Sequence, residues 1–162
     1  MNQLANAFGK NFLKHKDTVR TRTFELGGHT FKVKVPLTAE FEAMQQRLKQ
    51  VDDERVNKYY EELTTNLKPL KDVKDSSIKC EWLENDVLLD GRSMRETAKN
   101  KALLENRITE MFKMLVPEEQ GFDMGTITYS MIEELFPFPI QMQVVDEISK
   151  TISPSYEAQK GK

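Results

Sequence analysis

The chain has 162 residues, of which 38% are apolar and 31% charged, and its formal net charge is −2. This length suggests one domain or two small ones, and the high charged fraction predicts a modest core. No apolar run approaches the roughly 20 residues of a membrane span, and one cysteine with two histidines argues against a classical zinc site.

Residues 1–17 form a polar, basic leader that we expect to be flexible by itself. Leu4, Phe8 and Phe12 recur every four residues, which predicts a short amphipathic helix that orders on a partner. The leader lacks an uninterrupted apolar stretch, so we expect no secretory signal. Positive charge gathers at this end, because residues 1–34 carry seven Lys/Arg and two acidic residues.

Residues 18–26 and 30–35 are predicted to form a β-hairpin around Gly27-Gly28, because two glycines allow the positive φ of a tight turn. Val19 does not share the apolar alternation of the rest of the first strand. A two-stranded hairpin is marginal alone, so its apolar face must pack on helices or on another chain. Its open edges are candidate self-association sites, at Thr21, Thr23, Lys32 and Lys34.

A long helix is predicted from about Ala39 to Leu67, after an N-cap at Thr38. Its apolar residues form a narrow stripe of helical spacing among many charged residues. A stripe this narrow on a long helix is typical of a helix–helix seam rather than of deep burial. Pro69 ends the predicted helix.

The next segment is less regular. Apolar alternation favours a short strand or an extended arm, at Ile78, Cys80 and Trp82. Asp90-Gly91 indicates a turn. Ser93 and Glu96 then match a capping box, in which the serine oxygen accepts the amide three residues on and the glutamate reaches back. The helix that follows is predicted to run to about Val116.

A short helix is predicted to start at Thr126 or Thr128 and to end near Leu135. The sequence FPFP, residues 136–139, then breaks the chain, since each proline disfavours helical backbone in the residue before it. An amphipathic helix follows to Ile152. Apolar residues around this break are predicted to bind a partner, at Phe136, Phe138, Ile140, Val144 and Ile148.

Catalytic motifs are missing from the sequence: it has no Walker A, GxGxxG, HExxH, GxSxG or CxxC pattern. His15 lies in the leader and His29 in the hairpin turn. The adjacent carboxylates Asp52 and Asp53 point about 100° apart on a helix, so they do not converge on a substrate. We therefore expect no enzyme, no metal site and no cofactor.

The expected fold class is α+β, mainly α-helical, with an N-terminal β-hairpin packed on the helices. We expect a flexible leader over residues 1–17 and a single hairpin-plus-helices domain over 18–152. A disordered tail is expected over 153–162, because the last residues are polar.

The stretch TFELGGHTFKVKVPLTAEFEAM, followed by a charged helix, resembles the tail assembly chaperones of long-tailed bacteriophages. The resemblance covers residues 21 to about 50, which is under a quarter of the chain. It consists of a strand, a glycine turn, a second strand and a capped helix, and it includes no invariant motif.

This resemblance implies a non-enzymatic helper protein of the host cytoplasm that is not retained in the mature virion. It implies that the protein coats the tape-measure protein until tail-tube subunits polymerise around it. A longer form, made by programmed frameshifting, would recruit the tail-tube protein. The resemblance also implies homo-oligomerisation. Methionine-rich helices fit such a role because they adapt to apolar partners, and open strand edges fit it because they can pair between subunits.

Two other readings remain open. One is a structural tail-completion or neck component, which would be found in purified particles. The other is a small nucleic-acid-associated regulator that uses the basic N-terminal arm, with Lys32 and Lys34 on phosphates. A sequence pI near 5.8 argues against a dedicated nucleic-acid binder.

Overall fold

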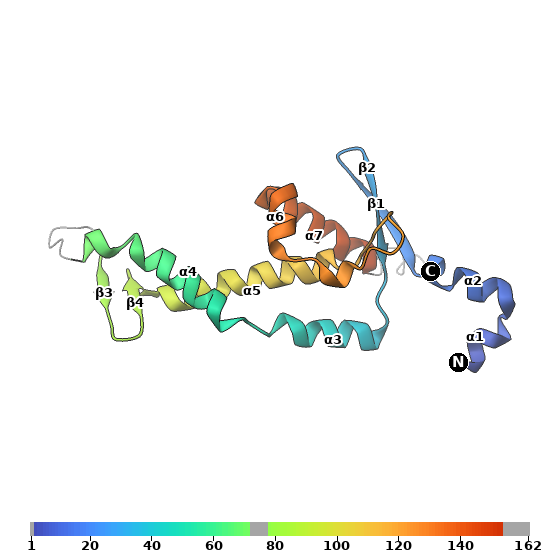
Figure 1. Ribbon diagram of the computed structural model, residues 1–162, viewed down its shortest axis with the longest axis horizontal. Helices are drawn as coiled ribbons and strands as arrows, with labels where there is room; N and C mark the ends of the chain where they lie inside the picture. Colours follow the sequence, from blue (N-terminus) through green and yellow to red (C-terminus); the bar gives the residue numbers. More distant parts are fainter. Residues whose placement is uncertain (1, 72–77, 154–162) are drawn as a thin grey trace, which may run out of the picture. The chain divides into compact units, whose positions relative to one another are not determined.

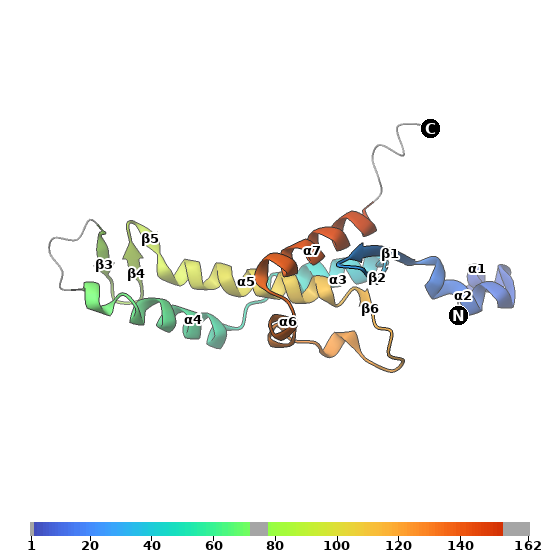
Figure 2. The ribbon, with the colours of Figure 1, turned by 90° about the horizontal axis from the view of Figure 1, so that it is seen from above.

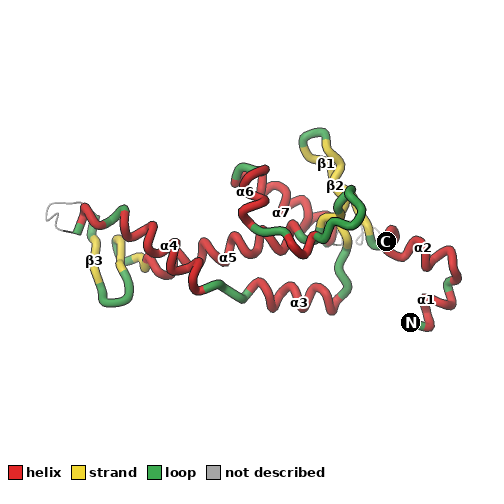
Figure 3. The backbone as a smooth tube through the Cα atoms, viewed as in Figure 1, coloured by secondary structure: helices red, strands yellow, loops and turns green. Residues whose placement is uncertain are grey.

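The computed structural model describes residues 2–71 and 78–153 (Figure 1). Within them the chain is α+β and mainly helical, with seven α-helices, two 3₁₀ turns and two three-stranded antiparallel sheets (Figure 3). The predicted fold class is confirmed. The tail predicted over 153–162 lies outside the described residues, apart from Ser153.

The chain divides into two compact units, Met1–Met44 with Ile108–Lys162 and, between them in sequence, Gln45–Arg107. The single domain predicted over 18–152 stays a prediction, because two compact units can fold together or separately. Unit 1 contains α1 (Gln3–Ala7), α2 (Gly9–Val19), β1 (Thr21–Leu26), β2 (His29–Lys34), the start of α3 (Thr38–Leu48), the end of α5 (Met94–Phe112), β6 (Leu115–Val116), a 3₁₀ turn (Met124–Thr126), α6 (Tyr129–Leu135) and α7 (Phe138–Ile152).

The sheet of unit 1 has the strand order β1-β2-β6. Phe24 pairs with Phe31 across the predicted hairpin, and Gly27 and Gly28 both have positive φ, 60° and 81°, as a type I′ turn requires. The first strand is shorter than predicted because α2 continues through Val19. Its helical position explains why Val19 does not share the strand alternation.

The β2 strand is central rather than an edge. Val33 pairs with Leu115 of β6, and the Lys34 N–H donates to the Met114 carbonyl oxygen at 3.0 Å. The open edge predicted at Lys32 and Lys34 is therefore covered by β6. Thr21 and Thr23 lie on β1, whose outer side has no paired strand within the described residues.

The helix predicted to reach Val116 ends at Phe112, and β6 follows. The physical reason lies in Pro117, because the ring of a proline disfavours helical backbone in the residue before it. Val116 is β-branched as well and is well suited to a strand. The residues at this point therefore favour extended backbone, although the helical spacing of apolar residues continues through them.

Helix α7 packs on β1 and β2 and supplies much of the core of unit 1. Val33, Val144 and Ile148 are fully buried there. Gln141 is buried among them, and its amide is satisfied: its Oε1 accepts the Tyr129 hydroxyl at 2.9 Å and its Nε2 donates to the Phe136 carbonyl at 2.8 Å. The hairpin thus packs on a helix, as predicted.

Unit 2 contains the end of α3, α4 (Asp53–Thr65), a 3₁₀ turn (Lys68–Leu70), β3 (Cys80–Trp82), β4 (Val87–Leu89), β5 (Arg92–Ser93) and most of α5. Val56 of α4 and the alanines Ala98 and Ala102 of α5 form its buried cluster. The predicted turn at Asp90-Gly91 is confirmed, since both residues have positive φ between β4 and β5.

The single helix predicted over residues 39–67 is two helices. Asp52 caps α4, because its Oδ1 accepts the Glu54 N–H at 3.1 Å. The Asn106 amide nitrogen donates to the carbonyls of Arg47 and Gln50, at 2.8 and 3.1 Å, and so satisfies backbone groups at the end of α3. Two side-chain caps, one from a distant helix, stabilise the break.

Candidate partner-binding surface

Helix α6 presents apolar side chains to solvent. It begins at the predicted N-cap Thr128, whose hydroxyl accepts the Met131 N–H at 3.4 Å. Tyr129 and Ile132 are buried, so the opposite side of the helix faces outward. On that side Met131 and Leu135, four residues apart, are 42% and 77% exposed.

The FPFP segment places a third apolar residue after α6. Phe136 has extended backbone and its ring packs against that of Phe112, with centroids 5.5 Å apart. Pro137 precedes α7, and Phe138 remains 49% exposed at the first position of that helix. We call Met131, Leu135 and Phe138 the α6 patch.

The structure separates the five residues predicted to bind a partner. Phe138 is exposed, and Phe136 and Ile140 are half-buried. Val144 and Ile148 are 0% exposed because they lie on the side of α7 that packs on the sheet. They belong to the core, so a partner surface in this structure excludes them. Met131 and Leu135 were not among the predicted partner residues, although they recur at helical spacing beside Glu133 and Glu134 in the sequence.

The α6 patch lies in an acidic part of the chain. Residues 114–149 contain seven acidic residues and no Lys, Arg or His. Glu134 is exposed on α6 and follows Met131 at the spacing i, i+3, which places the two side chains on neighbouring parts of the helix surface. The patch therefore favours a partner that is apolar and positively charged.

A second candidate surface is the outer edge of β1. In a hairpin with a two-residue turn, the flanking pair, here Leu26 and His29, is hydrogen-bonded, and such pairs then alternate along the strands. Thr21 and Thr23 fall between them, so their backbone groups point away from β2. These two of the predicted edge residues remain in place to pair with another strand.

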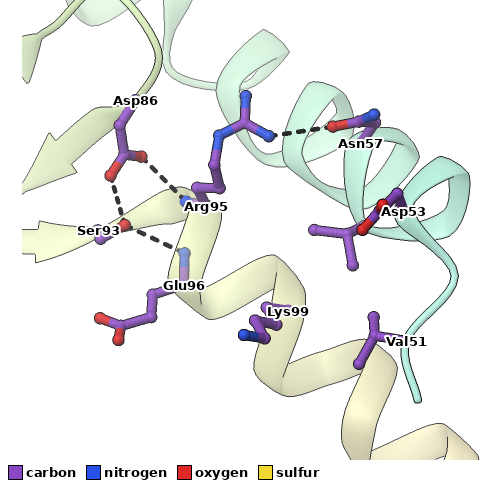
Figure 4. A pocket seen from close by; sticks show the side chains of 9 residues that line it. Val51, Asp53, Asn57, Asp86, Ser93, Arg95, Glu96 and Lys99 are labelled. Atoms are coloured by element: carbon purple, nitrogen blue, oxygen red, sulfur yellow. Dashed lines mark hydrogen bonds between the residues drawn. The ribbon is translucent and has the colours of Figure 1, made fainter.

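Unit 2 contains an open cleft of about 570 Å³ beside the start of α5 (Figure 4). Four of its polar side chains are hydrogen-bonded in pairs, Asn57 with Arg95 and Asp86 with Ser93. The Arg95 guanidinium donates to Asn57 Oδ1 at 3.0 Å and lies 4.0 Å from the centre of the Tyr60 ring. Ser93 Oγ accepts the Glu96 N–H at 3.1 Å, which confirms the serine half of the predicted capping box. This arrangement stabilises the start of α5.

Replacing Asp86 with alanine is expected to lower the free energy of unfolding by about 2–3 kcal/mol. Its carboxylate accepts the backbone N–H groups of Val87 and Arg95, at 2.7 and 3.0 Å, and the Ser93 hydroxyl. Burial raises the pKa of this carboxyl, but the three donors outweigh burial and leave the pKa below its ordinary value of 3.8. Its stabilisation is therefore present above pH 4 and is lost as the pH falls through the lowered pKa.

Urea unfolding of the wild type and of Asp86→Ala at pH 7 and pH 3 measures this effect. Glu84→Ala is the control, because that carboxylate is exposed on the same hairpin. Equal stability of Asp86→Ala and Glu84→Ala at pH 7 would contradict the capping role of Asp86.

The described residues contain no group of three or more His, Cys, Asp or Glu side chains placed to hold a metal ion. His15 hydrogen-bonds the Asn11 carbonyl within α2, and the His29 ring contacts the edge of Phe31. No helix among the described residues is both long and apolar enough to cross a membrane.

Comparison with protein-family models found no match, and comparisons with curated proteins and with solved structures found none either.

Proposed function

We propose that this protein is a tail assembly chaperone of a long-tailed bacteriophage, a non-enzymatic protein that binds the tape-measure protein. The observation that carries the proposal is the α6 patch, a set of exposed apolar side chains on the short, capped helix α6 and at the start of α7. The resemblance of residues 21 to about 50 to such chaperones supplies the identity of the client.

The chemistry of the patch suits a helical client. Leucine, methionine and phenylalanine side chains on a helix can receive the apolar stripe of an amphipathic helix. Met131 can adapt to different side chains, since its thioether chain is unbranched and flexible. Three exposed residues give a small interface, so each copy binds weakly and several copies are needed to cover a long client.

Weak, repeated binding also permits release. A client rod that carries many copies holds them by many small contacts, and tail-tube subunits can displace them one by one. The protein would act in the host cytoplasm and leave before the virion matures. A longer, frameshifted form would bring the tail-tube protein to the same rod.

Co-expression with overlapping segments of the tape-measure protein tests the proposal. A tag on the segment allows purification of the complex, and light scattering gives its mass. We expect a soluble complex that contains several copies of the 18.8-kDa chain on each segment. Segments that precipitate while the chain remains unbound would contradict the proposal. Detection of the chain in purified particles would favour a structural virion component instead.

A further inference from the structure

Helices α1 and α2 carry large apolar side chains that the core of unit 1 does not use. Neither helix contains a buried residue. Leu4, Phe8 and Val19 are 63%, 60% and 69% exposed. Within unit 1 the two helices lie next to each other beyond the N-terminal end of β1 (Figures 1 and 2). Their apolar side chains therefore face solvent and are available to a partner.

The contacts of Asp17 show which side of α2 is turned away from the hairpin. Its carboxylate pairs with Lys34 Nζ at 3.2 Å, and its carbonyl oxygen accepts the Thr21 hydroxyl at 2.7 Å. At about 100° per residue, Phe12 and Val19 lie roughly 140° and 160° around the helix from Asp17. The apolar side chains of Phe12 and Val19 are therefore on the side of α2 opposite the hairpin.

The apolar side of α2 continues into α1. The helices meet at Gly9, whose φ is 89°, and the rings of Phe8 and Phe12 lie 5.0 Å apart across this turn. Leu4 precedes Phe8 at the spacing i, i+4, which places the two side chains on neighbouring parts of the helix surface. We call Leu4, Phe8, Phe12 and Val19 the N-terminal apolar side.

The charges of these helices are mostly positive. Segment 2–19 contains three exposed lysines, Lys10, Lys14 and Lys16, and one acidic residue, Asp17. The Asp17 carboxylate already pairs with Lys34. The segment therefore combines an apolar side with a net positive charge, as peripheral membrane helices do.

The lysines are placed so that all three can act on a charged plane below the apolar side. Lys16 is four residues after Phe12 and three before Val19, so its aliphatic stem can lie along apolar surface while its ammonium reaches a phosphate. Lys10 and Lys14 are on the opposite side of α2, about one helix diameter of 10 Å away. This distance is close to the Debye length of about 8 Å at physiological ionic strength, so their attraction to such a plane is only partly screened.

We infer that α1 and α2 dock on the surface of an anionic phospholipid bilayer and lie in its headgroup region without spanning it. The N-terminal apolar side enters the boundary between headgroups and acyl chains, and the lysine ammonium groups bind lipid phosphates. Apolar burial and charge attraction act together, because the same orientation of α2 serves both.

A bilayer fits these helices better than a nucleic acid does. Nucleic-acid phosphates would engage the lysines and leave the aliphatic and aromatic side chains of Leu4, Phe8 and Val19 in water. A bilayer surface removes both kinds of side chain from their present exposure. The high exposed fractions of the apolar side chains therefore decide between the two polyanions.

Docking through α1 and α2 leaves the α6 patch unused. Residues 114–149, which include that patch, contain seven acidic residues and no Lys, Arg or His, so an anionic surface repels them. Membrane binding itself does not depend on the proposed function. One consequence does rest on it: the chaperone and its client would gather at the cytoplasmic leaflet, whose lipids are anionic.

Sedimentation of the full chain with lipid vesicles tests the inference. Vesicles of phosphatidylglycerol and phosphatidylcholine in equal parts are compared with vesicles of phosphatidylcholine alone. We expect the chain to bind only the anionic vesicles, and we expect binding to weaken as salt is added. Phe8→Ser should weaken binding about tenfold, because the ring is no longer buried in lipid. Phe122→Ser is the matched control, since Phe122 is 39% exposed in the acidic stretch and should not contact lipid.

Charge reversal tests the electrostatic part of the contact. Lys16→Glu should weaken vesicle binding about twentyfold, because each unit of charge near the surface contributes about fivefold. Lys58→Glu makes the same change at an exposed position of α4 and should bind like the wild type. Circular dichroism checks that each variant is folded, which we expect because Phe8 and Lys16 are both exposed.

Three results would overturn the inference: a wild type that ignores anionic vesicles, equal binding to both kinds of vesicle, or equal binding by wild type and Phe8→Ser. Binding of duplex DNA that Lys16→Glu abolishes, without binding of vesicles, would assign the basic helices to a nucleic acid instead. Phe8→Ser retains the α6 patch, so its binding to a tape-measure segment reports on the proposed function separately. Failure of membrane binding and failure of the proposed function are thereby distinguished.

Discussion

Leu135→Asp is expected to lower the affinity for a tape-measure segment about a hundredfold while the protein stays folded. The Leu135 side chain is the most exposed of the patch at 77%, so its replacement costs little stability. In a complex it would be desolvated within the apolar patch, where a carboxylate must lose its hydration. Loss of an apolar anchor and burial of a charge together account for about 3 kcal/mol.

The same change at two other sites gives matched controls. Leu83→Asp alters a leucine that is 53% exposed in unit 2, and it should leave both folding and client affinity unchanged. Val144→Asp places a carboxylate at a fully buried site and should unfold the protein. Titration calorimetry and circular dichroism separate these effects. Equal client affinity of the wild type and of Leu135→Asp would exclude the α6 patch as the binding site.

Glu105→Ala is expected to lower the free energy of unfolding by about 3 kcal/mol. Glu105 is 6% exposed in α5, and its carboxylate accepts the Tyr59 hydroxyl at 2.8 Å and pairs with Arg55 Nη2 at 3.3 Å. The Lys101 ammonium also lies 4.1 Å from the centre of the Tyr59 ring. Removal of the carboxylate leaves a half-buried hydroxyl and a guanidinium with fewer partners, which chemical denaturation would measure.

Alkaline pH provides a second test of the contacts among Glu105, Tyr59 and Arg55. Burial raises the pKa of Tyr59 above its ordinary value of 10.0, and the hydrogen bond to Glu105 raises it further. A raised pKa means that the tyrosine contributes stability below pH 10 and loses it as the pH rises through the folded-state pKa. Glu105→Ala should reduce the loss of stability at alkaline pH. Glu105→Gln can still accept a hydrogen bond, so it should be less destabilising than Glu105→Ala at pH 7. Unchanged stability of Glu105→Ala would contradict a structural role for the cluster.

Local patterns predicted the elements whose causes are local. The hairpin follows from alternation around Gly27-Gly28, and the start of α6 follows from Thr128. The break between α3 and α4 could not be predicted in this way, because Asn106, distant in sequence, binds the carbonyls of Arg47 in α3 and of Gln50 just after it. Pro117 and Val116 favour extended backbone at β6, but two residues are too few to show an alternation, and the pairing of β6 with β2 cannot be read from them.

The candidate partner surface was predicted only in part, because part of it depends on contacts between residues distant in sequence. Prolines at 137 and 139 indicated a break that exposes an aromatic ring, and Phe138 is exposed. Helical periodicity shows that α7 has an apolar side, but it does not say whether that side contacts the sheet or a partner. Val144 and Ile148 were therefore placed on a partner surface, although they lie against the sheet.

The mass of the complex with tape-measure segments tests the central claim most directly. Wild type and Leu135→Asp would each be co-expressed with the same tagged segment, and light scattering would give the number of 18.8-kDa chains on it. We predict several wild-type copies on each soluble segment and none of the variant. A segment that stays insoluble with both, or that binds both equally, would contradict the chaperone function assigned to the α6 patch.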